Sequence, residues 1–273
     1  MTLLNAIILG IIQGIGEFLP ISSSGHLLFV PWLFNWEYQD NLTFDVALHV
    51  GTLIAVLAFF WKDWFILIKD GLTKGIKTFE GKMFWCLVVA SIPGAIAGAL
   101  LDEVAENVFR GPLMPIILAC SLSIMGILLF LADRFGKQER DYEKMTFLDT
   151  LLIGISQAFA VIPGTSRSGV TMTMARALGV TREAAAKFSF LLSTPIIAGA
   201  ALYKFVLKPD EIAMNELFSL PCIVGVLTAM VVGFLSIAFL MKYLKKSSFN
   251  VFVIYRIAIA IILVVTYVVR TTV

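Results

Sequence analysis

Long apolar runs alternate with short polar stretches along the whole chain. Six of the runs approach or exceed the roughly 20 residues that an α-helix needs to cross a bilayer core. They lie at about residues 42–61, 83–101, 112–132, 187–207, 219–241 and 250–269. The two-residue alternation of a membrane β-barrel is absent, so helices are the elements that can satisfy the backbone within lipid. The pattern predicts an all-α polytopic membrane protein, with residues 1–273 in a single membrane domain.

Composition agrees with this fold class. The chain is 59% hydrophobic and 15% charged, against roughly 45–50% apolar and about 25% charged residues in soluble domains. The first apolar run contains Glu17 and follows no basic stretch, so we do not expect a cleaved signal peptide. The three cysteines lie in apolar runs without CxxC spacing, which favours packing over a metal or disulfide role. No nucleic-acid motif appears, and we expect no nucleic-acid partner.

An internal repeat appears when the chain is shifted by 144 residues. The stretch "LGIIQGIGEFLPISSSGH" at 9–26 then aligns with "IGISQAFAVIPGTSRSGV" at 153–170. Gln13 falls on Gln157 and Ser22 on Ser166. The common offset indicates a duplication, with repeat one at about 3–132 and repeat two at about 147–270.

Charge placement predicts how the repeats cross the membrane. Lysine and arginine gather in segments 62–82, 133–146 and 242–249, whereas segment 35–43 has none. By the positive-inside rule, the three basic segments are cytoplasmic. Further basic residues follow near 176–187, so residues 147–178 should enter and leave on the cytoplasmic side, and residues 3–34 on the outer side. Each half is then a re-entrant helical hairpin plus three transmembrane helices, in an inverted-topology repeat.

The hairpin turns have sequence signals for a break inside the membrane. Pro20 and Pro163 should end the first arms, and Gly25 and Gly164 or Gly169 allow a tight return. Each arm would have about 16 residues, roughly 24 Å of helix, which is shorter than the ~30 Å hydrocarbon core. The two turns should therefore meet within the membrane. Ser24 and Ser168 are candidate N-caps of the second arms.

Three ionisable residues, Glu17, His26 and Arg167, lie in these hairpins, where charge is costly and usually functional. Gln13 shares a helical face with Glu17. Arg167 stands between two serines at the start of an arm, a combination suited to phosphate. A serine, a carboxylate and a histidine within ten residues offer a nucleophile, a base or metal ligand, and a second proton carrier. A buried Glu17–Arg167 ion pair that only locks the repeats together is the structural alternative.

Asp45, His49 and Arg256 are further polar residues within apolar segments. Asp45 and His49 are one helical turn apart, and their repeat counterparts are Ser189 and Ser193. We favour a packing pair for them over a place in the site. Arg256 has no partner that the sequence identifies.

Two motifs resemble those of the bacterial undecaprenyl-diphosphate phosphatases, also called bacitracin-resistance proteins. The first, "QGIGEFLPISSSGH", matches that family's signature at Gln13, Glu17, Ser22, Ser23, Ser24, Gly25 and His26. The second, "PGTSRSGVT", matches at Pro163, Gly164, Ser166, Arg167, Ser168 and Thr171. Many members have Glu where this chain has Gln13. The amide keeps a coordinating oxygen but removes one charge, which leaves Glu17 as the main carboxylate.

The resemblance implies hydrolysis of the terminal phosphate of a C55 polyprenyl diphosphate, which yields the monophosphate carrier for peptidoglycan synthesis and confers bacitracin resistance. It implies a divalent cation, Mg²⁺ or Ca²⁺, and a multi-pass protein among the lipids of the bacterial inner (plasma) membrane, with the active site facing the extracytoplasmic side. The sequence leaves open whether two copies form a homodimer.

The resemblance also assigns roles to residues. Catalytic residues would be Glu17, Ser23, His26 and Arg167; phosphate-binding residues would be Ser22, Ser24, Ser166, Arg167, Ser168 and Thr171; metal ligands would be Glu17 and Gln13. In the hypothesis that follows, Ser23 attacks the terminal phosphorus and Glu17 or His26 takes its proton. Direct attack by water is the alternative mechanism. A lipid-phosphate or anion transporter is the alternative function, because inverted repeats are common in carriers, but the Glu–Ser–His cluster exceeds what binding alone requires.

Overall fold

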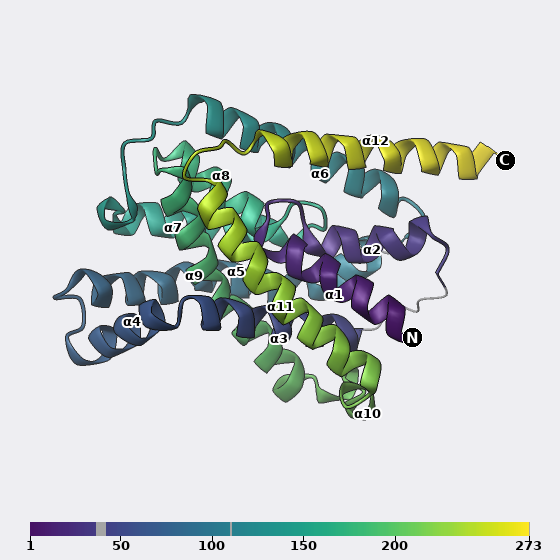
Figure 1. Ribbon diagram of the computed structural model, residues 1–273, viewed down its shortest axis with the longest axis horizontal. Helices are drawn as coiled ribbons and strands as arrows, with labels where there is room; N and C mark the ends of the chain where they lie inside the picture. Colours follow the sequence, from purple (N-terminus) through teal and green to yellow (C-terminus); the bar gives the residue numbers. More distant parts are fainter. Residues whose placement is uncertain (37–41, 110, 273) are drawn as a thin grey trace.

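The computed structural model describes residues 1–36, 42–109 and 111–272 (Figure 1). Their secondary structure is helical, apart from an isolated parallel bridge between Arg140 and Val180. The α-helices are α1 (Leu3–Phe18), α2 (Ser23–Leu33), α3 (Leu42–Phe59), α4 (Trp61–Thr73), α5 (Phe79–Phe109), α6 (Met114–Phe135), α7 (Phe147–Ser156), α8 (Arg167–Ala177), α9 (Arg182–Leu202), α10 (Met214–Leu217), α11 (Leu220–Tyr243) and α12 (Asn250–Thr272). Short helical segments of other types are η1 (Tyr142–Lys144), η2 (Gln157–Val161), η3 (Tyr203–Leu207) and η4 (Pro209–Glu211).

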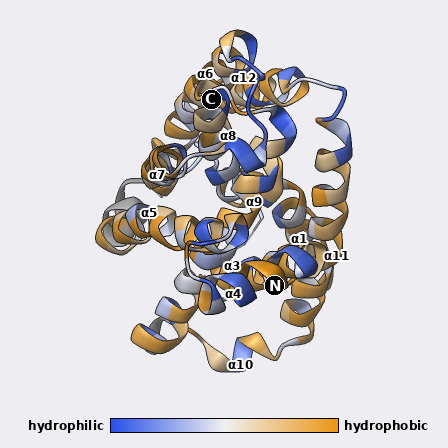
Figure 2. Cartoon of the chain, turned by 90° about the vertical axis from the view of Figure 1, so that its left-hand side faces the viewer, coloured by the Kyte–Doolittle hydropathy of each residue, from blue (hydrophilic) through white to orange (hydrophobic). Residues whose placement is uncertain are grey.

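Among the described residues, six helical segments are long and apolar enough to cross a membrane, as the sequence predicts. They are Leu42–Phe59, Phe79–Leu101, Met114–Phe135, Arg182–Leu207, Leu220–Tyr243 and Asn250–Thr272. Figure 2 shows hydrophobic residues along most of each long helix. Many large apolar side chains on these helices face outward, which suits a lipid surface and not water. The prediction of a polytopic, all-helical membrane protein is confirmed.

One predicted loop contains a helix. Segment 62–82 was expected to be a cytoplasmic loop, but α4 occupies its first half and packs against α5. The close approach depends on Gly71, where an added Cβ would lie 2.4 Å from the ring of Phe84. The indole N–H of Trp85 also donates to the carbonyl of Gly71 at 3.1 Å. Because lysines are scattered through this segment, its hydropathy pattern does not reveal the face of α4 that packs against α5.

The two halves of the chain pack into each other. Helix α1 lies along α11, and α7 lies along α5, so each first arm contacts a helix of the other half (Figure 1). Helix α3 contacts α9, and α6 contacts α12. Glycines permit the α1–α11 contact, because an added Cβ at Gly10 would lie 2.7 Å from the Gly225 carbonyl oxygen and one at Gly14 2.8 Å from the Gly233 nitrogen.

Both predicted helix breaks are present. Helix α1 ends at Phe18, and Leu19, before Pro20, is extended, with φ −73° and ψ 143°. Segment η2 ends at Val161, and Ile162, before Pro163, is extended in the same way. The first arm α1 has the expected 16 residues, whereas the second arms α2 and α8 have 11 each.

The N-caps of the second arms are Ser22 and Ser166, so the expectation of Ser24 and Ser168 as caps was wrong. The two cap hydroxyls accept hydrogen bonds from the backbone N–H groups of Gly25, at 3.2 Å, and Gly169, at 3.1 Å. Both serines also have positive φ, 77° and 70°. The return of the chain is therefore made at the serine before each helix, while Gly25 and Gly169 lie in the first helical turns.

The two breaks touch each other. The Gly164 N–H donates to Ser22 Oγ at 3.2 Å, and Ser168 Oγ donates to the Leu19 carbonyl at 3.1 Å. Non-helical backbone between hydrophobic helices needs such partners, because no bulk water satisfies it there. The contact brings residues about 145 positions apart in the sequence to one place.

Replacing Gly164 with Ala is expected to destabilise the second break. Gly164 has φ +90°, and an added methyl group would lie 2.1 Å from Ser121 Oγ. The backbone conformation alone should cost about 1–3 kcal/mol for a residue with a side chain. The check is the thermal unfolding midpoint in detergent. Gly199→Ala in α9 is the matched control, because a Cβ there meets nothing within 4 Å; equal midpoints for the two variants would contradict the expectation.

Candidate active site

The carboxylate of Glu17 is the centre of a buried polar cluster. Its Oε2 accepts a hydrogen bond from Ser23 Oγ at 2.8 Å and another from Gln13 Nε2 at 3.1 Å. Its Oε1 accepts from Arg167 Nη2 at 2.9 Å, which makes a salt bridge between the two breaks. The structure thus brings together Gln13, Glu17, Ser23 and Arg167, four of the residues that the sequence predicts.

Local geometry explains how Ser23 reaches Glu17. Gln13 and Glu17 are one turn apart on α1, so their side chains share a face. The chain then reverses, and Ser23 begins α2 directly against Gly16, where an added Cβ would lie 2.7 Å from Ser23 Cα. A side chain at Gly16 would push Ser23 away. The hydroxyl and the carboxylate therefore meet because the turn is tight.

Arg167 begins α8 and is oriented by α9. Its Nη1 lies 3.5 Å from the carbonyl of Ser189. The Ser189 hydroxyl is 2.7 Å from Thr171 Oγ1, which in turn donates to the Arg167 carbonyl at 2.8 Å. The Thr171 hydroxyl thus connects the backbone of Arg167 with the Ser189 side chain of α9. The guanidinium is mostly buried, so its charge acts in a poorly hydrated environment.

Most of the predicted phosphate-binding serines have backbone partners in this structure. Ser22 and Ser166 cap helices, and Ser168 joins the two breaks. Ser24 is only partly buried, with its hydroxyl 3.5 Å from Ser22 Oγ. Their role toward phosphate stays a prediction. What the structure adds is that three of these hydroxyls fix the shape of the breaks.

His49 also belongs to the cluster, although the sequence favours a packing pair with Asp45 for it. Its Nε2 lies 3.6 Å from Glu17 Oε2, and its Nδ1 lies 2.8 Å from the Asp45 carbonyl. The interpretation of a separate packing pair was therefore wrong for His49. Its side chain is 34% exposed, compared with 6% for Glu17 and 12% for Arg167, so it lies on the accessible side of the cluster. Of the two repeat counterparts, Ser189, which matches Asp45, contacts Arg167, whereas Ser193, which matches His49, donates to the Phe190 carbonyl.

His26 has both ring nitrogens bound outside the Glu17 cluster. Its Nδ1 is 2.7 Å from the Ser22 carbonyl, which can only accept, so this nitrogen carries the proton of the neutral ring. Its Nε2 then accepts from the Tyr255 hydroxyl at 2.8 Å, and the two rings stack. In this arrangement His26 orients the first break, and the proton acceptor next to Ser23 is Glu17.

Comparison with known proteins agrees with the two sequence motifs. A family model described as bacitracin resistance protein BacA matches residues 6–262. The chain belongs to this family. An undecaprenyl-diphosphatase of Pelotomaculum thermopropionicum is 54% identical over 266 residues, 97% of each chain. Another, from Moorella thermoacetica, is 52% identical over 267 residues, 98% of each chain. A third, from Caldicellulosiruptor bescii, is 46% identical over 270 residues, 99% of each chain.

Membership of the bacitracin resistance protein family confirms the resemblance that the motifs indicate. The match extends over nearly the whole chain and includes both breaks. The cluster around Glu17 is formed mainly by the two motifs that define the resemblance, one from each break. His49 joins it from α3, outside both motifs.

The donor set partly suits the divalent cation that the family resemblance implies. Within the described ranges, no group of three or more His, Cys, Asp and Glu side chains could hold a metal ion. However, the Oε1 atom of Gln13 is buried without a hydrogen-bond partner, beside the Glu17 carboxylate. Mg²⁺ commonly takes one or two protein oxygens and completes its shell with water and substrate phosphate. These two residues fit a cation that arrives with a phosphorylated substrate.

Proposed function

We propose that this protein is an undecaprenyl-diphosphatase, which hydrolyses the terminal phosphate of undecaprenyl diphosphate to leave the lipid monophosphate. The observation that most supports this function is that the Ser23 hydroxyl contacts one oxygen of the Glu17 carboxylate while Arg167 binds the other. A hydroxyl, a base and a fork of cationic donors are the parts that phosphoryl transfer requires. Relatives with this name match nearly the full chain, which supports the proposal.

In the proposed reaction, Arg167 exchanges part of its contact with Glu17 for the terminal phosphate. Ser23 Oγ attacks the phosphorus, and its proton passes to the Glu17 oxygen that it already contacts. The bond from phosphorus to the bridging oxygen breaks, the proton passes from Glu17 to the oxygen of the leaving undecaprenyl phosphate, and that product leaves. Water then attacks the phosphoserine and gives its proton to the ionised Glu17, which returns it to the Ser23 oxygen as phosphate is released. The protein contributes mainly position and charge, as in phosphoryl transfer generally.

A divalent cation, Mg²⁺ or Ca²⁺, belongs to the proposal. Glu17 and the free carbonyl oxygen of Gln13 would hold it. Such a cation would supply positive charge that offsets the charge of the diphosphate. Because Gln13 is neutral, the protein offers one carboxylate to the cation, and affinity for it should depend strongly on the bound substrate.

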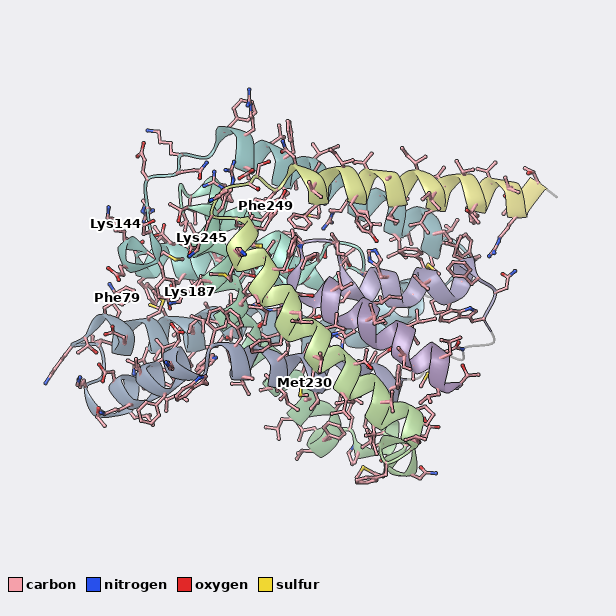
Figure 3. All side chains as sticks on the ribbon, in the orientation of Figure 1. Phe79, Lys144, Lys187, Met230, Lys245 and Phe249 are labelled. Atoms are coloured by element: carbon pink, nitrogen blue, oxygen red, sulfur yellow. The ribbon has the colours of Figure 1, made fainter. Side chains whose placement is uncertain are left out.

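The proposed setting is the bacterial inner membrane, with two inverted repeats and two re-entrant hairpins, and with the site reached from the extracytoplasmic side. The crossed packing of α1 on α11 and α7 on α5 supports the repeat. Lys144, Lys187 and Lys245 lie together at the end of the molecule away from both chain termini (Figures 1 and 3). By the positive-inside rule, that end is cytoplasmic. The termini then face outward, with the open ends of α1 and α2.

The experiment is phosphate release from undecaprenyl diphosphate by purified protein in detergent, with chelator and after readdition of Mg²⁺ or Ca²⁺. We expect multiple turnovers that the chelator suppresses and either cation restores. The same preparation in liposomes should not exchange labelled phosphate across the bilayer. Exchange without hydrolysis, on substrates of several chain lengths, would contradict the proposal and favour a carrier.

A further inference from the structure

Arg256 in α12 is buried at the point where the two breaks meet. It is 0% exposed. Its Nη1 donates to the Pro20 carbonyl at 3.0 Å, and its Nη2 donates to the carbonyls of Gly164 at 2.7 Å and Thr165 at 3.1 Å. Its Nε donates to the Leu122 carbonyl of α6 at 3.1 Å. One guanidinium therefore connects the first break, the second break and two membrane-spanning helices.

The chemistry of these contacts is unusual for a buried arginine. All four acceptors are backbone carbonyls, and the salt bridges of the described residues do not include Arg256. A buried charge without a carboxylate is expensive, and apolar residues often replace buried ions with no loss of stability. A contribution to folding stability is thus a weak explanation for an arginine at position 256. Its planar fork does, however, suit several carbonyls that point from different segments.

Three of the four carbonyls, those of Pro20, Gly164 and Thr165, lie close in sequence to the two main site residues. Pro20 precedes Ser23 by three positions, and Thr165 precedes Arg167 by two. The neighbouring residue Tyr255 donates its hydroxyl to His26, which supports the same first break. One short stretch of α12 therefore touches the backbone that places the nucleophile and the backbone that places the phosphate-binding arginine.

We propose that Arg256 is a positioning residue for the reaction. By joining Pro20 to Gly164 and Thr165, it sets the separation of Ser23 and Arg167 so that both can reach one phosphate group. This inference rests on the proposed function. Arg256 itself does not touch the substrate, and it lies outside both sequence motifs.

The kinetic test compares wild-type protein with Arg256→Lys. Lysine keeps the charge but cannot bridge carbonyls on separate segments with a rigid fork. A misplacement of about 1 Å can cost about 10²-fold in rate, so we expect a fall of about 100-fold in kcat with KM changed less than about threefold. Arg176→Lys is the matched control. Arg176 is also 0% exposed but binds Asp133 and nearby carbonyls away from the cluster, so its variant should keep kcat.

A second variant tests the route of the effect. In an Arg167→Ala background, the residue that Arg256 positions is missing. Adding Arg256→Lys there should cost less than about threefold, because the two losses are not additive when one acts through the other. A full 100-fold loss in that background, or a kcat for Arg256→Lys within threefold of Arg176→Lys, would overturn the proposal.

A distance measurement separates this proposal from the proposed function. Ile11 on α1 and Ile162 beside the second break are partly exposed and can carry spin labels. The distance between the two labels reports the separation of the hairpins. Arg256→Lys should broaden or shift that distance distribution, and Arg176→Lys should not. If wild-type protein releases no phosphate, the proposed function fails, whereas an unchanged distance in Arg256→Lys overturns the positioning role itself.

Discussion

Replacing Glu17 with Gln is expected to lower the turnover number for phosphate release by about 10³-fold or more, with the protein still folded. The amide has nearly the shape of the carboxylate and can still bind Ser23, but it cannot take the proton of the attacking hydroxyl. Loss of a general base usually costs about 10²–10⁴-fold. The contact with Arg167 also loses its charge. The measurement is kcat at saturating substrate, beside a thermal unfolding curve.

The control for this variant is Asp70→Asn. Asp70 is also buried and charge-paired, with Lys74 at 2.9 Å, but it lies on α4 away from the cluster. It should keep the wild-type kcat. A Glu17→Gln protein within tenfold of wild type would remove Glu17 from the role of base.

The alternative that Glu17 and Arg167 only lock the two halves together has its own test. A protein with both Glu17→Arg and Arg167→Glu can re-form the ion pair in the opposite sense. If the ion pair only held the two halves together, the double variant would recover both its unfolding midpoint and its turnover. Our account expects partial recovery of the unfolding midpoint without turnover, because Ser23 would then face a guanidinium in place of a base.

Replacing Arg167 with Lys should give the second large loss, about 10²–10³-fold in kcat, similar to removal of a preorganised donor from a site of developing charge. Lysine keeps the positive charge but lacks the planar pair of N–H groups that binds phosphate oxygens in parallel. It also cannot reach Glu17 and the Ser189 carbonyl at the same time, as the guanidinium does. Initial rates over a range of substrate concentrations would measure the change.

Arg182→Lys is the matched control for Arg167→Lys. Arg182 begins α9 and pairs with Asp133 at 2.7 Å, outside the cluster. Its replacement should leave kcat near the wild-type value. Equal rates for the two lysine variants would mean that the fork of Arg167 has no special function.

Hydropathy was sufficient for much of the fold, because lipid imposes a length and an apolar surface on each spanning helix. The breaks were also predictable, since Pro20 and Pro163 restrict the backbone before them. Helix α4 was not, because its buried face consists of a few residues such as Leu67 and Gly71 that fit one partner helix. The caps differed by two residues from the expectation, because backbone geometry at the turn decides which serine precedes the helix.

The residues of the candidate site were likewise predictable from the sequence only in part. Gln13, Glu17, Ser23 and Arg167 could be found from two short motifs, since local geometry joins the first three and the contact of the two breaks adds Arg167. His49 and Arg256 could not be placed in this way, because their contacts come from helices distant in the sequence. For His26, the sequence did not show that Tyr255, 229 residues later, binds its second nitrogen, and its catalytic role stays a prediction.

The central claim is that Ser23 attacks the terminal phosphate with Glu17 as its base. The most direct measurement is a single-turnover reaction with undecaprenyl diphosphate labelled in the terminal phosphate, quenched at short times and followed by peptide mapping. We predict that label appears on Ser23, decays as free phosphate is released, and is absent from Ser23→Ala protein, which does not turn over. Hydrolysis by Ser23→Ala at a near wild-type rate, without labelled serine in the wild type, would contradict the account and assign the attack to water.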